Sequence, residues 1–317
     1  MVNKPIGLED MKSSIKNISI IGAGAMGAVY ARMLYDMDAG CVSFVARGER
    51  LERLRREGLI INGKLYNIPV ISPEEQTTPA GLIIVAVKNQ HLDYAIHDMR
   101  NCVGPETIII SVMNGIESEE QIGAVYGVDK VLYCVALGID ALREGNRVIY
   151  TMQGKLFFGE SSNHPSPTQR VKRVQELFNR AGIVYETPPD MLHVLWWKFM
   201  INVGINQASA VLRAPYAVFQ TSSEARALMT SAMREVIALA QKAGVNLSES
   251  DISGFDPFLA RLSPQGKTSM LQDVEAGRKT EVEMFAGQVI ALGKQYDIPV
   301  PVNQMLFDKI TAIESEK

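Results

Sequence analysis

One segment of the sequence places polar side chains at a spacing that can do chemistry in apolar surroundings. Lys198, Asn202 and Asn206 are four residues apart, so on an α-helix they form a single stripe. Their neighbours in residues 196–206 are mostly apolar or aromatic, which indicates a largely buried helix. Because a buried ammonium or amide is costly without a partner, the stripe predicts a ligand crevice. The alternative is a surface stripe on a partly exposed helix.

A lysine beside apolar walls is suited to general acid catalysis. Desolvation disfavours the ammonium form and would lower the pKa of Lys198 toward neutrality. Such a lysine could polarise a carbonyl and then protonate the developing alkoxide as a nicotinamide delivers hydride. Asn202 and Asn206 could orient a polar substrate and hold the lysine side chain.

A glycine motif near the start of the chain has the pattern of a dinucleotide-binding turn. Residues 22–27 fit G-x-G-x-x-G, follow an apolar run at 18–21 and open a helix expected over 25–37. Gly22 allows the tight turn, Gly24 lets the backbone approach a pyrophosphate, and Gly27 allows close helix–strand packing. A glycine turn without a ligand is the alternative.

The residues that follow the second expected strand, 42–45, favour NADP(H) over NAD(H). An acidic residue at this point would bind the ribose 2′-hydroxyl of NAD. The chain instead has Arg47 and Arg50, which can form charge-assisted hydrogen bonds with a 2′-phosphate. The alternative is a pair of solvated arginines balanced by Glu49 and Glu52.

Two further polar groups follow expected strands. Lys88 comes after the apolar run at 82–87, and Asn114-Gly115 comes after the run at 107–112. Because α/β sheets bind ligands at the carboxyl ends of their strands, both are expected to point into one crevice. A solvated lysine and an Asn-Gly hairpin turn are the alternatives.

A second polar cluster occupies residues 269–273 and 277–281, on a helix expected over about 269–296. On such a helix Ser269 and Asp273 share a face, as do Arg278 and Glu281. Periodicity alone leaves open whether this cluster is functional or a solvated charged face.

The elements around these motifs predict an α/β fold with two domains. Short apolar runs alternate with helical segments, which indicates a doubly wound Rossmann-type sheet. Closely spaced strands at 131–137, 147–151 and 155–158 predict an antiparallel extension of that sheet. Pro215, Gly244, Pro257 and Pro299 are turn signals in an all-helical second half. The expected limits are an N-terminal tail at 1–16, an NADP-binding Rossmann domain at 17–188, and a helical substrate and catalytic domain at 189–317.

Composition excludes several classes of protein. The chain has 317 residues, 47% hydrophobic and 21% charged, with a net charge of −3, so we expect a soluble protein with no nucleic-acid partner. Cys41, Cys102 and Cys134 have no paired spacing and the histidines have no ligand spacing, so neither a disulfide nor a metal is expected. No apolar leader or membrane-spanning run is present, which favours the cytoplasm. An apolar helical face leaves a homodimer open.

Together the motifs resemble the ketopantoate reductase (2-dehydropantoate 2-reductase) family from about residue 17 to the C-terminus. The resemblance rests on the glycine motif, Val87-Lys88, Asn114-Gly115, the Lys198 stripe and the segments 269–273 and 277–281. It implies NADPH-dependent reduction of 2-dehydropantoate to (R)-pantoate on the route to pantothenate and coenzyme A. It also implies a Rossmann domain, a helical domain and a cleft between them.

The resemblance assigns roles residue by residue. Lys198 would protonate the C2 oxygen, and the catalytic Glu281 would engage the substrate and help to position that lysine. Arg47 would bind the 2′-phosphate. The implied substrate contacts are Asn114, Asn202, Asn206 and Ser269, and the implied cofactor contacts are Gly22, Gly24, Ala25, Met26, Gly27, Arg47, Lys88, Asn114 and Glu281.

Two other functions remain open on the sequence. The same chemistry could act on another branched 2-oxo acid, because the motifs define the reaction better than the tail of the substrate. A non-catalytic NADP(H)-sensing module is the alternative from a different class.

Overall fold

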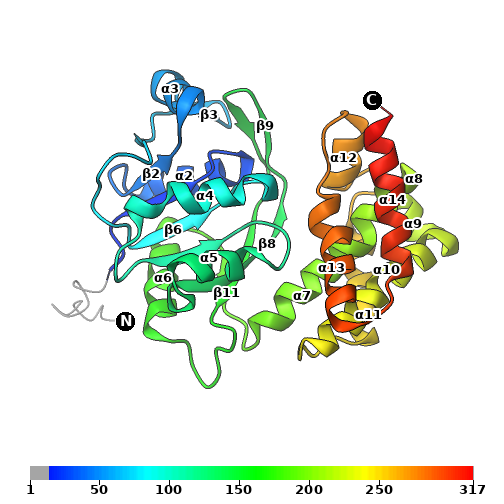
Figure 1. The fold of residues 1–317 in the computed structure, drawn as a ribbon. Helices are drawn as coiled ribbons and strands as arrows, with labels where there is room; N and C mark the ends of the chain where they lie inside the picture. Colours follow the sequence, from blue (N-terminus) through cyan, green and yellow to red (C-terminus); the bar gives the residue numbers. More distant parts are fainter. Residues whose placement is uncertain (1–13, 317) are drawn as a thin grey trace, which may run out of the picture. The chain divides into compact units, whose positions relative to one another are not determined.

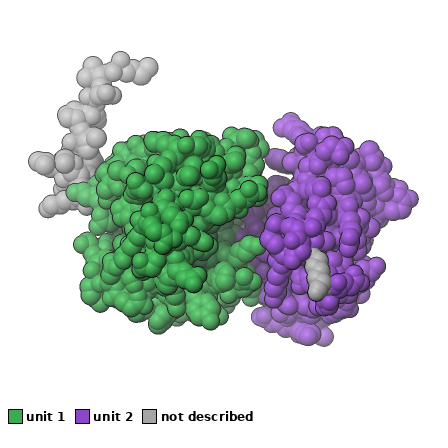
Figure 2. Space-filling view, turned by 90° about the horizontal axis from the view of Figure 1, so that it is seen from above, with its two compact units in different colours: residues 1–113, 117–191 green, residues 114–116, 192–317 purple. Residues whose placement is uncertain are grey.

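The computed structural model describes residues 14–316, which form two compact units (Figure 2). Unit 1 contains the described residues up to Met113 together with Glu117–Met191, and unit 2 contains Asn114–Ile116 and the chain from Leu192 onward. The domain limit expected after residue 188 stays a prediction. Of the tail expected at 1–16, residues 1–13 lie outside the described part, whereas Ile15 is buried in the core of unit 1.

Unit 1 is built on an eight-stranded sheet with the order β12-β11-β8-β7-β6-β1-β2-β5 (Figure 1). Neighbouring strands from β5 to β8 pair in parallel, and β11 pairs antiparallel with β8. This confirms the predicted Rossmann-type sheet with its antiparallel extension. The strands are β1 (Ile18–Ile21), β2 (Val42–Val45), β5 (Val70–Ile71), β6 (Leu82–Val85), β7 (Ile108–Ser111), β8 (Val131–Ile139), β11 (Gln153–Gly159) and β12 (Tyr185–Glu186).

Helices cover both faces of this sheet, because its central strands are apolar on both sides. Ile20 and Ile84 pack in one hydrophobic cluster with α2 and α6, whereas Ile21 and Ile83 pack in another with α4 and α5. The helices are α2 (Ala25–Met37), α3 (Gly48–Glu57), α4 (Leu92–Asp98), α5 (Ser118–Tyr126) and α6 (Gln169–Ala181), with short 3₁₀ turns η1 (Asn89–His91), η2 (Arg100–Cys102) and η3 (Val128–Lys130).

A second, four-stranded sheet has the order β4-β3-β10-β9. Its strands are β3 (Leu59–Ile61), β4 (Lys64–Tyr66), β9 (Leu142–Glu144) and β10 (Arg147–Ile149). The expectation that residues 147–151 extend the main sheet is therefore wrong, since β10 pairs parallel with β3 and antiparallel with β9. The Asp140 carboxylate accepts the backbone N–H groups of Thr151 and Met152 at 2.8 and 2.7 Å, which ties the two ends of the β9–β10 hairpin together.

In the described residues of unit 2, all the regular secondary structure is helical. Its centre is α10 (Ser223–Lys242), whose buried residues include Met229, Met233 and Val236. Pro257 is not a turn signal as expected but lies inside α11 (Glu249–Arg261), where the buried Phe255 and Leu259 hold the helix against its neighbours. The other elements are α7 (Met191–Ile201), the π-helix η4 (Asn202–Asn206), α8 (Gln207–Leu212), α9 (Tyr216–Thr221), α12 (Ser269–Glu275), the π-helix η5 (Glu283–Gly287), α13 (Gln288–Tyr296) and α14 (Pro301–Ser315).

Among the described residues, no helix has both the length and the apolar character needed to cross a lipid bilayer.

Candidate functional site

The glycine turn of unit 1 connects β1 to α2, and two of its glycines are required by close backbone contacts. Gly22 has φ +109°, and a Cβ at this position would lie 2.5 Å from the carbonyl oxygen of Ala86. A Cβ on Gly27 would lie 2.0 Å from the carbonyl oxygen of Gly22, so α2 packs directly on the turn. Around Gly24, by contrast, a Cβ would meet only the Ala86 oxygen at 3.8 Å. The turn is therefore tight on its inner side and uncrowded at Gly24.

The start of α2 fits a pyrophosphate. Gly24 is the N-cap residue and offers no side chain to the first turn, so no side chain caps the N–H groups that open this helix of 13 residues at Ala25 and Met26. Free N–H groups and the positive end of the helix dipole favour an anion. Binding of a dinucleotide by these residues stays a prediction.

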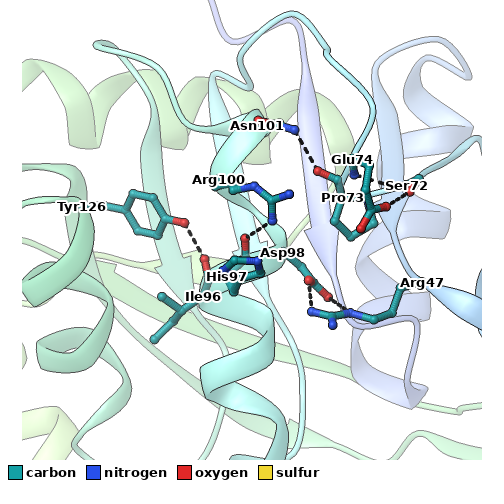
Figure 3. A network of polar contacts seen from close by, with 10 residues as sticks. All are labelled: Arg47, Ser72, Pro73, Glu74, Ile96, His97, Asp98, Arg100, Asn101 and Tyr126. Atoms are coloured by element: carbon teal, nitrogen blue, oxygen red, sulfur yellow. Dashed lines mark hydrogen bonds and ion pairs between the residues drawn. The ribbon is translucent and has the colours of Figure 1, made fainter.

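Arg47 is held by a carboxylate that the sequence did not single out (Figure 3). It is the N-cap residue of α3, and its Nε donates to Oδ2 of Asp98 at 2.8 Å while Nη2 donates to Oδ1. Its guanidinium also lies 5.4 Å from the centre of the Tyr94 ring. The Arg47 side chain is 48% exposed and that of Asp98 only 12%. The hydrogen bonds that Arg47 donates to the Asp98 carboxylate raise the pKa of Arg47.

This geometry changes the interpretation of Arg47. The partner is Asp98, at the end of α4, and not Glu49 or Glu52, so the alternative of two arginines balanced by their neighbours is wrong for Arg47. The hydrogen bonds to Asp98 use Nε and one N–H of Nη2. They leave Nη1 and the second N–H of Nη2, which together could form a bidentate contact with a phosphate.

Asp98 is itself fixed by the packing of α4 and the loop after it (Figure 3). The Tyr126 hydroxyl donates to the carbonyl of Ile96, and Nη1 of Arg100 donates to the carbonyl of His97 at 3.3 Å. Sequence reasoning missed Asp98 because 51 residues separate it from Arg47 and no local pattern marks it. Only the crossover between β6 and β7 brings α4 beside the end of β2.

Lys88 lies at the carboxyl end of β6, as expected. It is exposed, and its carbonyl accepts the backbone N–H of His91 at 2.9 Å, which starts the turn η1. The carbonyl of Ala86 packs against the glycine turn at Gly22, and Lys88 follows Ala86 by two residues. The cofactor role of Lys88 stays a prediction.

The polar stripe of unit 2 lies where an α-helix becomes a π-helix. Lys198 is in the last turn of α7 and is half-buried, whereas Asn202 and Asn206 are the first and last residues of η4. The Nδ2 of Asn206 donates to Oδ1 of Asn202 at 3.1 Å, so these two side chains are neighbours. The α-helix expected over 196–206 is wrong in this detail. Segments of π-helix are frequent at functional sites.

Close packing of η4 against α10 explains the π segment. A Cβ on Gly204 would lie 2.6 Å from Cγ of Met233 on α10, so only glycine allows η4 to approach that helix this closely. Asn206 is 6% exposed and Asn202 is half-buried. The surface-stripe alternative is wrong for Asn206, which is buried.

Asn114 belongs with unit 2 rather than with the sheet it follows. Its Nδ2 donates to Oε2 of Glu281 at 3.1 Å, and both residues are half-buried. Gly115 has φ +91°, and a Cβ there would lie 3.0 Å from Cγ of Met284 in η5. No strand follows, since α5 begins at Ser118, so Asn114-Gly115 is not a hairpin turn.

The helix expected over about 269–296 is interrupted, and Arg278 and Glu281 do not share a helix face. Gly277 adopts φ +67° after α12, and the backbone N–H of Arg278 returns to the carbonyl of Asp273 at 2.8 Å. The Arg278 Nε also donates to the Asp273 carboxylate at 2.6 Å. This pair closes the end of α12, whereas Ser269, its first residue, is exposed.

Packing in unit 2 gathers most of the predicted substrate residues around η4. The segment η4 packs against both η5 and α12. Ser269 is the first residue of α12, and Glu281 lies two residues before η5, so both are close in the chain to elements that η4 contacts. An amine, three amides and one carboxylate are thereby offered by a single unit. In residues 14–316 no three His, Cys, Asp or Glu side chains form a group that could hold a metal ion.

Comparison with known proteins gives matches along nearly the whole chain. Residues 18–163 match the family described as Ketopantoate reductase PanE/ApbA, and residues 190–314 match Ketopantoate reductase PanE/ApbA C terminal. The 2-dehydropantoate 2-reductase of Pyrococcus horikoshii is 26% identical over 303 residues, which is 94% of this chain and 97% of that protein.

Solved structures show the same architecture. That of a 2-dehydropantoate 2-reductase from Geobacter metallireducens is 25% identical with a TM-score of 0.81, and covers 93% of this chain and 99% of its own. A D-mandelate dehydrogenase with NADH and anilino(oxo)acetate is 21% identical with a TM-score of 0.84, and covers 95% of this chain and 99% of its own. The likeness to the dehydrogenase shows a shared fold alone.

Proposed function

Because the chain belongs to the ketopantoate reductase PanE/ApbA family, a family of oxidoreductases, we propose that it reduces 2-dehydropantoate to (R)-pantoate with NADPH. The observation that carries the proposal is the group formed by Lys198, the hydrogen-bonded pair Asn202 and Asn206, and the hydrogen-bonded pair Asn114 and Glu281. These are the polar groups that a short, hydroxylated 2-oxo acid requires.

The proposed chemistry divides between the dinucleotide and the side chains of unit 2. The reduced dinucleotide supplies the hydride when it is bound at the glycine turn. The Lys198 ammonium polarises the C2 carbonyl and donates its proton to the C2 oxygen as that oxygen becomes an alkoxide. Glu281, oriented by Asn114, accepts a hydrogen bond from the substrate and keeps the lysine aimed at the C2 oxygen.

Asn202 and Asn206 orient the substrate in this proposal. The hydrogen bond between them uses one N–H of Asn206 and leaves the amide group of Asn202 its two donors. An oriented amide donor can bind the carboxylate or a hydroxyl of the oxo acid without reorganising during the reaction. Ser269, which is exposed at the start of α12, adds a hydroxyl to this set.

The preference for NADPH rests on arginine at the end of β2. An acidic residue there would repel a 2′-phosphate, whereas Arg47 is already oriented by Asp98 and keeps Nη1 for a further acceptor. We also propose a reducing cytoplasmic location, since Cys41, Cys102 and Cys134 are all buried as thiols in unit 1.

The test is a steady-state assay of the purified protein with 2-dehydropantoate, run with NADPH and then with NADH. We expect turnover with a higher kcat/KM for NADPH. If kcat/KM is higher for a branched 2-oxo acid without the hydroxyl group, that acid and not 2-dehydropantoate is the substrate. Binding of NADPH without turnover of any 2-oxo acid would instead favour a sensing module.

A further inference from the structure

Arg143 has buried nitrogen atoms that no group in the structure satisfies. It lies on β9, and its Nε donates to the carbonyl of Gly145 at 2.9 Å. Both Nη1 and Nη2 are buried, and neither has a hydrogen-bond partner among the described residues. Buried polar atoms are nearly always paired, and an unpaired cation is more costly than a neutral group. The position therefore calls for an acceptor that residues 14–316 do not supply.

Two more arginines face this position from α3. Arg50 and Arg53 are one turn apart on that helix, and both are exposed. Burial, and then the positive charges of Arg50 and Arg53, lower the pKa of Arg143 to about 10. Partial desolvation of its guanidinium group, and then the charge of Arg53, also lower the pKa of Arg50. Three guanidinium groups thus lie close enough together for their positive charges to repel one another.

Other arginines of α3 have acidic partners, unlike the arginines of this cluster within the described residues. Arg55 pairs with Glu75, and Arg56 pairs with Glu57. In the part of the chain that the structure describes, neither Arg50 nor Arg53 has an ion pair. The three guanidinium groups thus form a local excess of positive charge in a chain whose net charge is −3.

The cluster lies beside the expected adenosine end of a dinucleotide. The helix α3 starts directly after Arg47 and leads into β3 (Figure 1). In the small sheet, β10 lies between β3 and β9. All of these elements belong to unit 1. The small sheet is therefore what brings Arg143 to the helix that follows the end of β2.

We propose that Arg143, Arg50 and Arg53 form a binding site for a phosphate monoester. A phosphate offers several acceptor oxygens and about two negative charges at neutral pH, which match two unpaired Nη atoms and two further guanidinium groups. The phosphate is either the ribose 2′-phosphate of the dinucleotide or a group on a separate ligand. Only the first identification rests on the proposed function.

The binding experiment requires no turnover. The full chain is titrated calorimetrically with adenosine 2′,5′-bisphosphate, adenosine 5′-diphosphate and inorganic phosphate, as wild type and as Arg143→Gln, Arg50→Gln and Arg56→Gln. Arg56 is the matched control, because it is a surface arginine of the same helix that pairs with its neighbour Glu57. Loss of charged hydrogen bonds should weaken phosphate binding by about tenfold or more.

The three probes distinguish the ribose 2′-phosphate of the dinucleotide from a phosphate on a separate ligand. Weaker binding of the 2′,5′-bisphosphate in Arg143→Gln and Arg50→Gln, with unchanged binding of the 5′-diphosphate, identifies the ribose 2′-phosphate. Weaker binding of inorganic phosphate with unchanged binding of both nucleotides identifies a separate ligand. If both variants bind all three probes as Arg56→Gln does, the site does not exist. Failure to reduce 2-dehydropantoate would overturn the proposed function and leave this result standing.

Thermal unfolding tests whether a change in binding comes from lost stability of the variant and not from a lost phosphate contact. Because the unpaired guanidinium costs stability without a ligand, Arg143→Met should raise the Tm of the ligand-free protein by about 2–4 °C. Saturating phosphate should raise the Tm of the wild type and leave that of Arg143→Met unchanged. A lower Tm in ligand-free Arg143→Met would show that Arg143 stabilises the fold, and would count against the site.

Discussion

The amide of Asn114 donates a hydrogen bond to the carboxylate of Glu281, with 3.1 Å between Nδ2 and Oε2, although 167 residues separate the two in sequence. The bond fixes the orientation of a half-buried carboxylate in unit 2. A carboxylate held in this way can accept a hydrogen bond from a substrate without first losing rotational freedom. The proposed reaction is therefore expected to depend on both residues of this pair.

Removing the charge of Glu281 should impair the chemical step more than substrate binding. We expect Glu281→Gln to lower kcat for 2-dehydropantoate by about 10²-fold, because a neutral amide neither accepts as strongly nor keeps Lys198 aimed. Asn114→Ala should lower kcat by about tenfold, since the carboxylate remains but loses its orientation. Steady-state kinetics of both variants and of the double variant measure this.

The double variant decides whether the two residues act together. If Asn114 acts through Glu281, the double variant should be no worse than Glu281→Gln alone. Losses that simply multiply would show that the two side chains act independently and would reject the positioning role of Asn114.

Replacing Lys198 tests the proposed proton donor. Lys198→Ala should lower kcat by about 10²-fold or more, and Lys198→Arg should not restore it, because a guanidinium does not release its proton at neutral pH. The affinity for NADPH, measured by fluorescence titration, should be nearly unchanged in both variants. Turnover at the wild-type rate in Lys198→Ala would end the general acid proposal.

Arg47 should discriminate between the two dinucleotides. Arg47→Ala is expected to raise KM for NADPH by about tenfold or more and to leave KM for NADH nearly unchanged, because only NADPH carries the 2′-phosphate. The substitution also leaves the nearly buried Asp98 carboxylate without its partner. The double variant Arg47→Ala/Asp98→Asn, which removes that charge too, is the control. Equal losses for both dinucleotides would refute the role.

Alanine substitutions at Gly22 and Gly48 distinguish the cost of backbone strain from the cost of a steric clash. Both have positive φ, +109° and +53°, but a Cβ on Gly22 would lie 2.5 Å from the Ala86 oxygen, whereas nothing lies within 4 Å of one on Gly48. Gly22→Ala should therefore reduce the free energy of unfolding by more than about 2 kcal/mol, and Gly48→Ala by about 1 kcal/mol. Urea unfolding measures both. Similar losses in the two variants would show that the turn relaxes around the added methyl group.

The sequence by itself determined the elements whose signals are local. The helix expected over 25–37 and the strand expected over 42–45 have the limits that the structure shows. Continuous apolar strands predicted a sheet covered on both faces, and the glycine motif predicted the tight turn after β1. These features follow from periodicity and from backbone sterics within a few residues, which a sequence displays directly.

Only the tertiary structure decided which distant groups meet. The bonds of Arg47 to Asp98 and of Asn114 to Glu281 join residues with no shared local pattern. The π turn at η4 depends on the approach of Gly204 to Met233, which helical periodicity cannot show. The small sheet was also missed, although Asn62-Gly63, with φ values of +46° and +82°, marked the β3–β4 hairpin. Pairing, packing and charge balance depend on distances in space, and those exist only once the chain has folded.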